Sequence, residues 1–206
     1  MDRCGLDVMI ARSPANVTYF TGYECWIDPL MKQYMENPGG PSDPVSNPTT
    51  TNNLVTDDYG TIGGGGGNQA GNGGVDTTDA TYATVGGGYS NDASGYASTV
   101  GGGLDNMASG TRATVGGGSY NEAIADYSTV AGGYVNTASG IHSTVGGGYD
   151  NTAAGDYSFA AGYSANDGGY NDVFIWGDSG GGTATGDNQF NVHASGGIVL
   201  NGVVQH

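Results

Sequence analysis

The stretch TVGGGYDNTAAG, residues 144–155, recurs with small changes through most of the chain. A valine returns every 15 residues, and Ala160 continues its series. Rows of Thr, Gly, Asn and Ala keep the same period. A less regular copy of the repeat comes earlier in the chain; it has Ile62 in place of the valine, and an eight-residue insertion separates it from Val85. Self-similarity at a fixed period is typical of repeat architectures. The valine row is Val85, Val100, Val115, Val130 and Val145, and the asparagine row is Asn91, Asn106, Asn121, Asn136, Asn151 and Asn166.

A 15-residue unit of this composition predicts a coil of two short strands. Gly, Thr, Val and Tyr disfavour a helix. In IHSTV, Ser143 and Val145 share one face and His142 and Thr144 the other, so Ser and Val point inward. The triple glycine turns the chain, and a second strand around NTASG returns with Ala inward. Stacked coils would pair in parallel and place the asparagines in an amide ladder. We therefore expect an all-β parallel β-helix or β-roll solenoid.

The predicted core is thin, because each coil offers one Val and one or two Ala or Ser for burial. At about 25 cal/mol per Å² of buried apolar surface, this core hardly offsets the ordering of a whole coil. Several chains around a common axis would bury a second face, and a closed trimer is a natural solution. The sequence therefore predicts a homo-oligomer.

Charge and hydropathy exclude several classes of partner. The formal net charge is −16, and residues 41–206 carry 15 acidic residues against one basic residue, Arg112. Such a surface repels phosphate, so we expect no nucleic-acid partner and no insertion into a membrane. No signal peptide or apolar membrane-spanning run is visible.

The glycine-rich motif does not match a known chemical site. A phosphate-binding P-loop ends in Lys-Ser or Lys-Thr, and no lysine follows Lys32. Calcium-binding glycine–aspartate repeats recur every nine residues with a fixed Asp, whereas the period here is 15. His142, His193 and His206 are dispersed. We predict no catalytic, metal or cofactor-binding residues and no enzyme activity.

Outward tyrosines form the candidate binding surface. Tyr89, Tyr134 and Tyr149 share one repeat position, and Tyr82, Tyr127 and Tyr157 share another. Tyrosine contacts sugars and peptide surfaces at low entropic cost, so such rows could be adhesive. They could equally protect strand edges.

Coils such as YASTVGGGLDNMASG and DYSTVAGGYVNTASG resemble the head repeats of YadA-type trimeric autotransporter adhesins and related phage tail-fibre shafts. The resemblance covers roughly residues 57–200. It implies a left-handed trimeric β-roll that serves as a surface-exposed adhesin head or fibre shaft, located extracellularly on a cell or virion, with a glycan or protein ligand. The usual head unit is about 14 residues with an S-V-A-x-G strand, and no membrane-anchoring barrel or long coiled-coil stalk follows here. A self-assembling filament subunit is the alternative.

The first 45 residues are of a different type. MDRCGLDVMIARSPANVTYFTGYECW is similar to the start of the N-terminal domain of creatinase and Xaa-Pro peptidases, without the metal ligands of that family's catalytic domain. A peptidase relative is therefore the least favoured function. We expect a small strand-and-helix segment at 1–45, a linker at 46–56, β-roll repeats at 57–172 and a C-terminal β cap at 173–206. Cys4 and Cys25 are free thiols or a disulfide pair.

Overall fold

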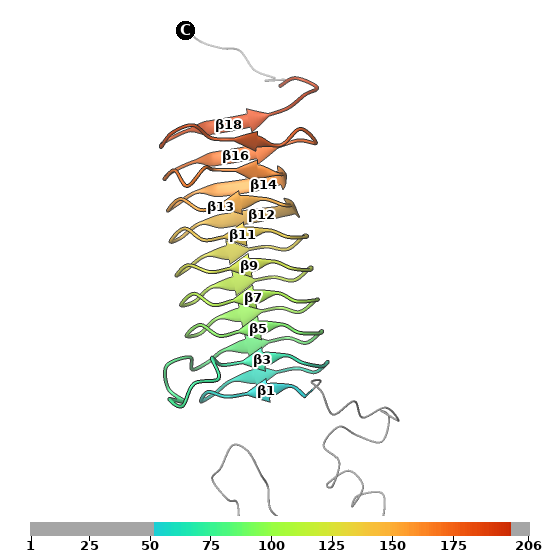
Figure 1. Cartoon of the computed structure of the whole chain (residues 1–206), viewed down its shortest axis with the longest axis vertical. Coiled ribbons are helices and arrows are strands. Elements are labelled where there is room, and N and C mark those ends of the chain that lie inside the picture. The colour runs from blue at the N-terminus through green and yellow to red at the C-terminus, as the bar shows by residue number, and fades with distance from the viewer. Residues whose placement is uncertain (1–51, 199–206) are drawn as a thin grey trace, which may run out of the picture. The chain divides into compact units, whose positions relative to one another are not determined.

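The computed structural model describes residues 52–198, which form a parallel β-solenoid with no helix in that range. Two short strands per coil alternate between two sheets of nine strands each. Figure 1 shows the strands stacked one above another along the axis. The predicted β-solenoid is confirmed. The N-terminal segment 1–45, with Cys4 and Cys25, lies outside the described residues, as do most of the linker and His206.

Sheet A consists of the odd-numbered strands, from β1 to β17. Its members are β1 (Leu54–Val55), β3 (Gln69–Ala70), β5 (Asp92–Ala93), β7 (Met107–Ala108), β9 (Glu122–Ala123), β11 (Thr137–Ala138), β13 (Thr152–Ala153), β15 (Ala165–Asn166) and β17 (Gly182–Thr183).

Sheet B consists of the even-numbered strands. Its members are β2 (Thr61–Ile62), β4 (Thr84–Val85), β6 (Thr99–Val100), β8 (Thr114–Val115), β10 (Thr129–Val130), β12 (Thr144–Tyr149), β14 (Phe159–Tyr163), β16 (Phe174–Gly177) and β18 (Phe190–His193).

The core is a pair of stacked rows between the two sheets. Each valine of the sequence row is fully buried and pairs in register with the next, as Val130 does with Val145. The alanines of sheet A, such as Ala138, are equally buried and stack in the same way. A small residue one position before each sheet B threonine completes the core, for example Ser143. The inward alternation predicted from IHSTV is therefore what the chain adopts.

A buried asparagine row runs along one corner of the coils. The Asn121 amide nitrogen donates to Asn106 Oδ1 (3.1 Å) and to the Gly117 and Gly133 carbonyls (both 2.9 Å). Its own Oδ1 accepts from the Asn136 backbone N–H (3.1 Å) and side-chain amide (3.0 Å). The same pattern links Asn91 to Asn151, and it extends toward the N-terminus through Asn68 and Asn53.

Asn166 does not continue this row. Its coil is one residue shorter at the glycine corner, where Gly162 pairs with Gly148 across a register shift. Ala165 takes the ladder position and donates its N–H to Asn151 Oδ1 (3.0 Å), while Asn166 pairs with Thr152 and is exposed.

The solenoid extends beyond the expected boundaries at both ends. β1 begins at Leu54, inside the range expected to be a linker, and pairs with β3. The segment expected to be a C-terminal β cap provides β16 and β18, which continue sheet B. Ile175 fills the core place of the valines, and this is why the coil pattern persists without the TVGGG motif. The insertion forms the loop after β3, visible beside that strand in Figure 1.

The third glycine of each triplet has a backbone that no other residue fits. At Gly118 φ is +89°, and an added Cβ would lie 2.2 Å from the Gly133 carbonyl oxygen. The first glycine of the triplet is different, because alanine occupies that place in the next coil at Ala131 and again at Ala161.

Substitution of these glycines separates the two roles. Gly118→Ala should lower the free energy of unfolding by at least about 2 kcal/mol, through backbone strain and overlap with the neighbouring coil. An added Cβ at Gly116 would also lie close to next-coil backbone, 2.3 Å from the Ala131 carbonyl oxygen, but Gly116 does not have a left-handed φ. Gly116→Ala should therefore cost less than Gly118→Ala, because the stack accepts alanine at the equivalent Ala131 without backbone strain at that residue. Thermal and denaturant unfolding of both variants measures the difference. Equal losses would contradict the assignment of strain to the third glycine.

Candidate functional site

Tyr89, Tyr134 and Tyr149 all lie in one row at the glycine corner. Consecutive members of this row are joined by parallel bridges in neighbouring coils. All three tyrosines are about half exposed. We call this row the glycine-corner ladder; from the N-terminal end it consists of Gly66, Tyr89, Leu104, Ser119, Tyr134, Tyr149 and Tyr163.

The N-terminal and C-terminal parts of the glycine-corner ladder differ in whether the tyrosine rings expose their faces or their edges. Tyr134 and Tyr149 stack with ring centroids 5.6 Å apart and an interplanar angle of 13°, and Tyr149 stacks on Tyr163 at 5.1 Å and 11°. Stacked rings cover each other's faces and present their edges and hydroxyls. This part of the ladder therefore favours hydrogen bonding over sugar stacking.

Tyr89 has no such stacking partner. Its neighbours in the row are Gly66, which has no side chain, and Leu104. No aromatic ring among residues 52–198 stacks on it, and its side chain is 48% exposed. Of the three tyrosines singled out in the sequence, Tyr89 is the one whose ring has no aromatic partner within residues 52–198.

A second row lies at the opposite corner, immediately before the sheet B strands. Tyr59 and Tyr82 stack at 5.0 Å, and His142 lies between Tyr127 (4.7 Å) and Tyr157 (5.3 Å). We call this the threonine-corner ladder: Tyr59, Tyr82, Ala97, Arg112, Tyr127, His142 and Tyr157. Every member has a positive φ between 52° and 64°. From Tyr82 onward, the backbone N–H of each member donates to a carbonyl of the preceding coil, as that of His142 does to Asp126 (3.1 Å).

The sequence did not reveal this backbone conformation. Positive φ is uncommon outside glycine, and here it recurs in tyrosine, arginine and histidine. The coil-to-coil hydrogen bonds compensate for the strain. The repeated 15-residue spacing of Tyr127, His142 and Tyr157 was the available signal that they lie together.

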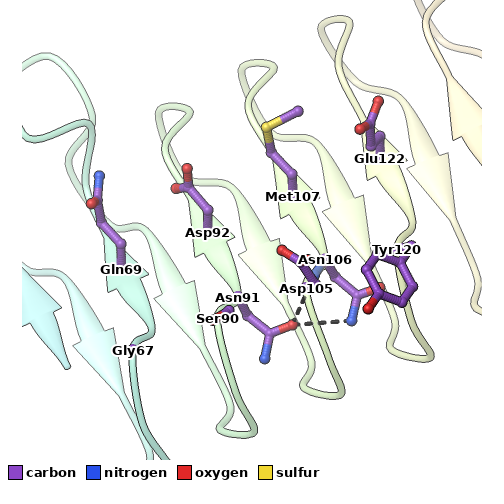
Figure 2. A pocket seen from close by; sticks show the side chains of 10 residues that line it. All are labelled: Gly67, Gln69, Ser90, Asn91, Asp92, Asp105, Asn106, Met107, Tyr120 and Glu122. Atoms are coloured by element: carbon purple, nitrogen blue, oxygen red, sulfur yellow. Dashed lines mark hydrogen bonds between the residues drawn. The ribbon is translucent and has the colours of Figure 1, made fainter. Parts of the chain in front are cut away.

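The outer face of sheet A carries a shallow groove, shown in Figure 2. It crosses four coils, and Gln69, Asp92, Met107 and Glu122 stand side by side along it from consecutive strands. Asp92 lies between Gln69 and Met107, and its Oδ1 is buried with no hydrogen-bond partner among the described residues. Burial raises the pKa of Asp92 above the usual 3.8, an effect partly offset by the nearby Ser94 hydroxyl.

Within residues 52–198, no three His, Cys, Asp or Glu side chains are close enough to share a metal ion. No helix in that range is long and apolar enough to cross a membrane. The candidate binding surfaces of the described residues are therefore the two ladders and the groove on sheet A.

Removing the Asp92 charge should stabilise the solenoid. A raised pKa in the folded state means that folding opposes ionisation of Asp92, so the ionised form costs stability. Asp92→Asn should raise Tm at neutral pH, and this gain should disappear once the pH falls below the ordinary pKa of 3.8, where the wild-type carboxyl is protonated in both states. Thermal unfolding between pH 3 and 7 measures the effect, with exposed Asp105→Asn as the control. A gain that is independent of pH would contradict the burial argument.

Tyrosine variants separate stability from surface binding. Tyr149→Ser removes two stacked contacts and should lower the free energy of unfolding by about 1–3 kcal/mol, whereas Tyr89→Ser should change it by less than about 0.5 kcal/mol.

If the glycine-corner ladder is adhesive, the triple change of Tyr89, Tyr134 and Tyr149 to serine should abolish binding to cells while the chain stays folded. Binding equal to wild type would contradict the adhesive role.

Comparison with known proteins supports the resemblance of the repeats. A family model described as the Ubiquitous surface protein adhesin repeat matches residues 128–140, which is less than one coil and includes β10 and β11. No curated protein matches the chain. The adhesin-repeat match and the parallel solenoid together fit a β-roll of the YadA type.

Proposed function

We propose that this chain is a non-enzymatic fibre module that works as a left-handed trimeric β-roll on a cell or virion surface, as an adhesin head or a tail-fibre shaft. The adhesin-repeat match and the solenoid support a structural or adhesive protein. The observation that carries the trimeric proposal is the uncharged outer face of sheet B.

The outward residues of sheet B are uncharged from end to end. A threonine stands at the first outward place of six consecutive strands, and a phenylalanine stands there in the last three. Phe159, Phe174 and Phe190 stack at 5.0 and 4.7 Å. The second outward place is occupied by Gly or Ala in most coils and by Trp176 and Val192 near the C-terminal end.

The outer face of sheet A differs in charge. Asp92 and Glu122 stand at its outward places. Burying an unpaired carboxylate against another chain costs free energy, whereas threonine methyl groups, glycine backbone and phenylalanine rings can be buried without that cost. Sheet B is therefore the face on which copies of this chain would pack.

Packing on sheet B would also compensate for the thin core. A coil buries one valine, one alanine and one small residue such as Ser143 between its sheets. Cyclic symmetry lets the same face of each chain contribute to one closed interface. Three copies around a common axis would give every coil a second buried layer.

A filament is the second candidate, and it rests on the open ends of both sheets. β1 and β17 end sheet A, and β2 and β18 end sheet B. Leu54 and Val55 of β1 are about half exposed. Unpaired strand edges of this kind can pair with another unit end to end.

Light scattering on a sizing column tests the oligomer. The wild-type chain should elute with a mass near three times 20.6 kDa. The double variant Thr114→Glu/Thr129→Glu places two charges on the sheet B face, and its mass should fall to that of one chain. Large polydisperse particles from the wild-type chain would favour the filament.

The control places the same charges on the opposite face. Thr137→Glu/Thr152→Glu lies at the equivalent outward places of sheet A, which are similarly half-buried. This variant should keep the wild-type mass. A monomeric wild-type chain, or equal dissociation of both variants, would contradict the proposed interface.

A further inference from the structure

Arg112 is the only lysine or arginine after Lys32, and it lies in the threonine-corner ladder of a strongly acidic protein. Its side chain is exposed. An exposed cation with no role in the core would ordinarily be mobile in solvent, but the contacts of this side chain hold it in one place.

The guanidinium lies between two aromatic rings. Its Cζ is 5.5 Å from the ring centroid of Tyr96 on one side and 5.5 Å from that of Tyr127 on the other. One Arg112 terminal nitrogen also donates to the Tyr127 hydroxyl (2.8 Å).

These contacts leave donors of the guanidinium available. A guanidinium carries five N–H donors in a fixed plane. Within the described residues, one of these donors bonds a side-chain acceptor, the Tyr127 hydroxyl. In the acidic row of Asp126 and Asp156, one oxygen of each carboxylate accepts a backbone N–H of the preceding coil, from Thr111 (2.9 Å) and Ile141 (2.8 Å).

A positioned guanidinium with open donors suits a carboxylate. The planar fork binds a carboxylate through two parallel hydrogen bonds, and a side chain already held in place loses little entropy on binding. The groups beside Arg112 include the phenol of Tyr127, on which the His142 ring stacks, and the Thr111 hydroxyl, with the Asp126 carboxylate held on the Thr111 backbone N–H. Such a strip can form hydrogen bonds with hydroxyl groups beside the carboxylate.

The charge of the whole chain limits the ligand to a single anionic group. With a formal net charge of −16, the surface repels polyanions such as sulfated chains or acidic peptide segments. We propose that Arg112, held between Tyr96 and Tyr127, binds the carboxylate of an acidic sugar on an otherwise neutral glycan. This inference rests on the proposed adhesive function and names the ligand class of a surface apart from the glycine-corner ladder.

Calorimetric titration of the full-length chain tests the site. The probes are 3′-sialyllactose, methyl β-glucuronide and lactose, which distinguish a sialic acid, a uronic acid and the neutral sugar. One or both acids should bind saturably, and lactose should bind at least about tenfold more weakly, since a charge-assisted bidentate contact contributes that much. Arg112→Gln should lower the affinity for the acid about tenfold or more. Arg112→Lys should also bind weakly, because it keeps the charge and loses the fork.

Two controls keep the result unambiguous. Light scattering and thermal unfolding of each variant show that assembly and fold are retained, and Tyr170→Ser, an exposed tyrosine outside both ladders, should bind the acid as wild type does. Equal binding by Arg112→Gln, equal binding of lactose, or no binding of either acid would overturn the proposal. If wild-type chain and Arg112→Gln attach to cells equally well, the adhesive function stands and the Arg112 site fails.

Discussion

The buried asparagine row is the interaction on which the rest of the solenoid depends. Each side-chain amide in the row from Asn91 to Asn151 donates to the preceding asparagine, to a glycine carbonyl of its own coil and to a glycine carbonyl of the next coil. A buried amide without these partners costs about 1–3 kcal/mol, so a shift of one residue in any coil is opposed by several unsatisfied groups. The row therefore fixes the register of every coil against its neighbours.

Fixed register determines the surface. Because equivalent residues stand above one another, any side chain at an outward place contacts its counterpart in the next coil. Tyrosines thus become a stacked ladder, threonines become a continuous uncharged face, and a single arginine is inserted between two rings. Buried positions and the third glycine of each triplet hardly vary between coils, while the exposed places of the two ladders vary. The two corners and the outer faces are consequently where function can differ along the fibre.

Much of this arrangement could be predicted from the sequence, because a strict 15-residue period imposes equivalent environments. The two-strand coil, the inward valines and the parallel stacking follow from alternation and from the glycine triplet. The period alone could not show that one residue is missing near Ala161, and Asn166 was therefore misplaced. Coils after residue 172 keep the core volume with Ile175 but lose the motif. The stacked faces of Tyr134 and Tyr149, the positive φ of the threonine-corner ladder and the contacts of Arg112 need three-dimensional geometry.

Exchange of the asparagine side-chain amide hydrogens, followed by NMR in heavy water, tests the central role of the buried row most directly. The side-chain amides of Asn106, Asn121 and Asn136 should exchange as slowly as the buried backbone amides, because each is held by partners in two other coils. The exposed amide of Asn166 should exchange rapidly. Rapid exchange of Asn106, Asn121 and Asn136 while the backbone stays protected would contradict the claim that this row fixes the register.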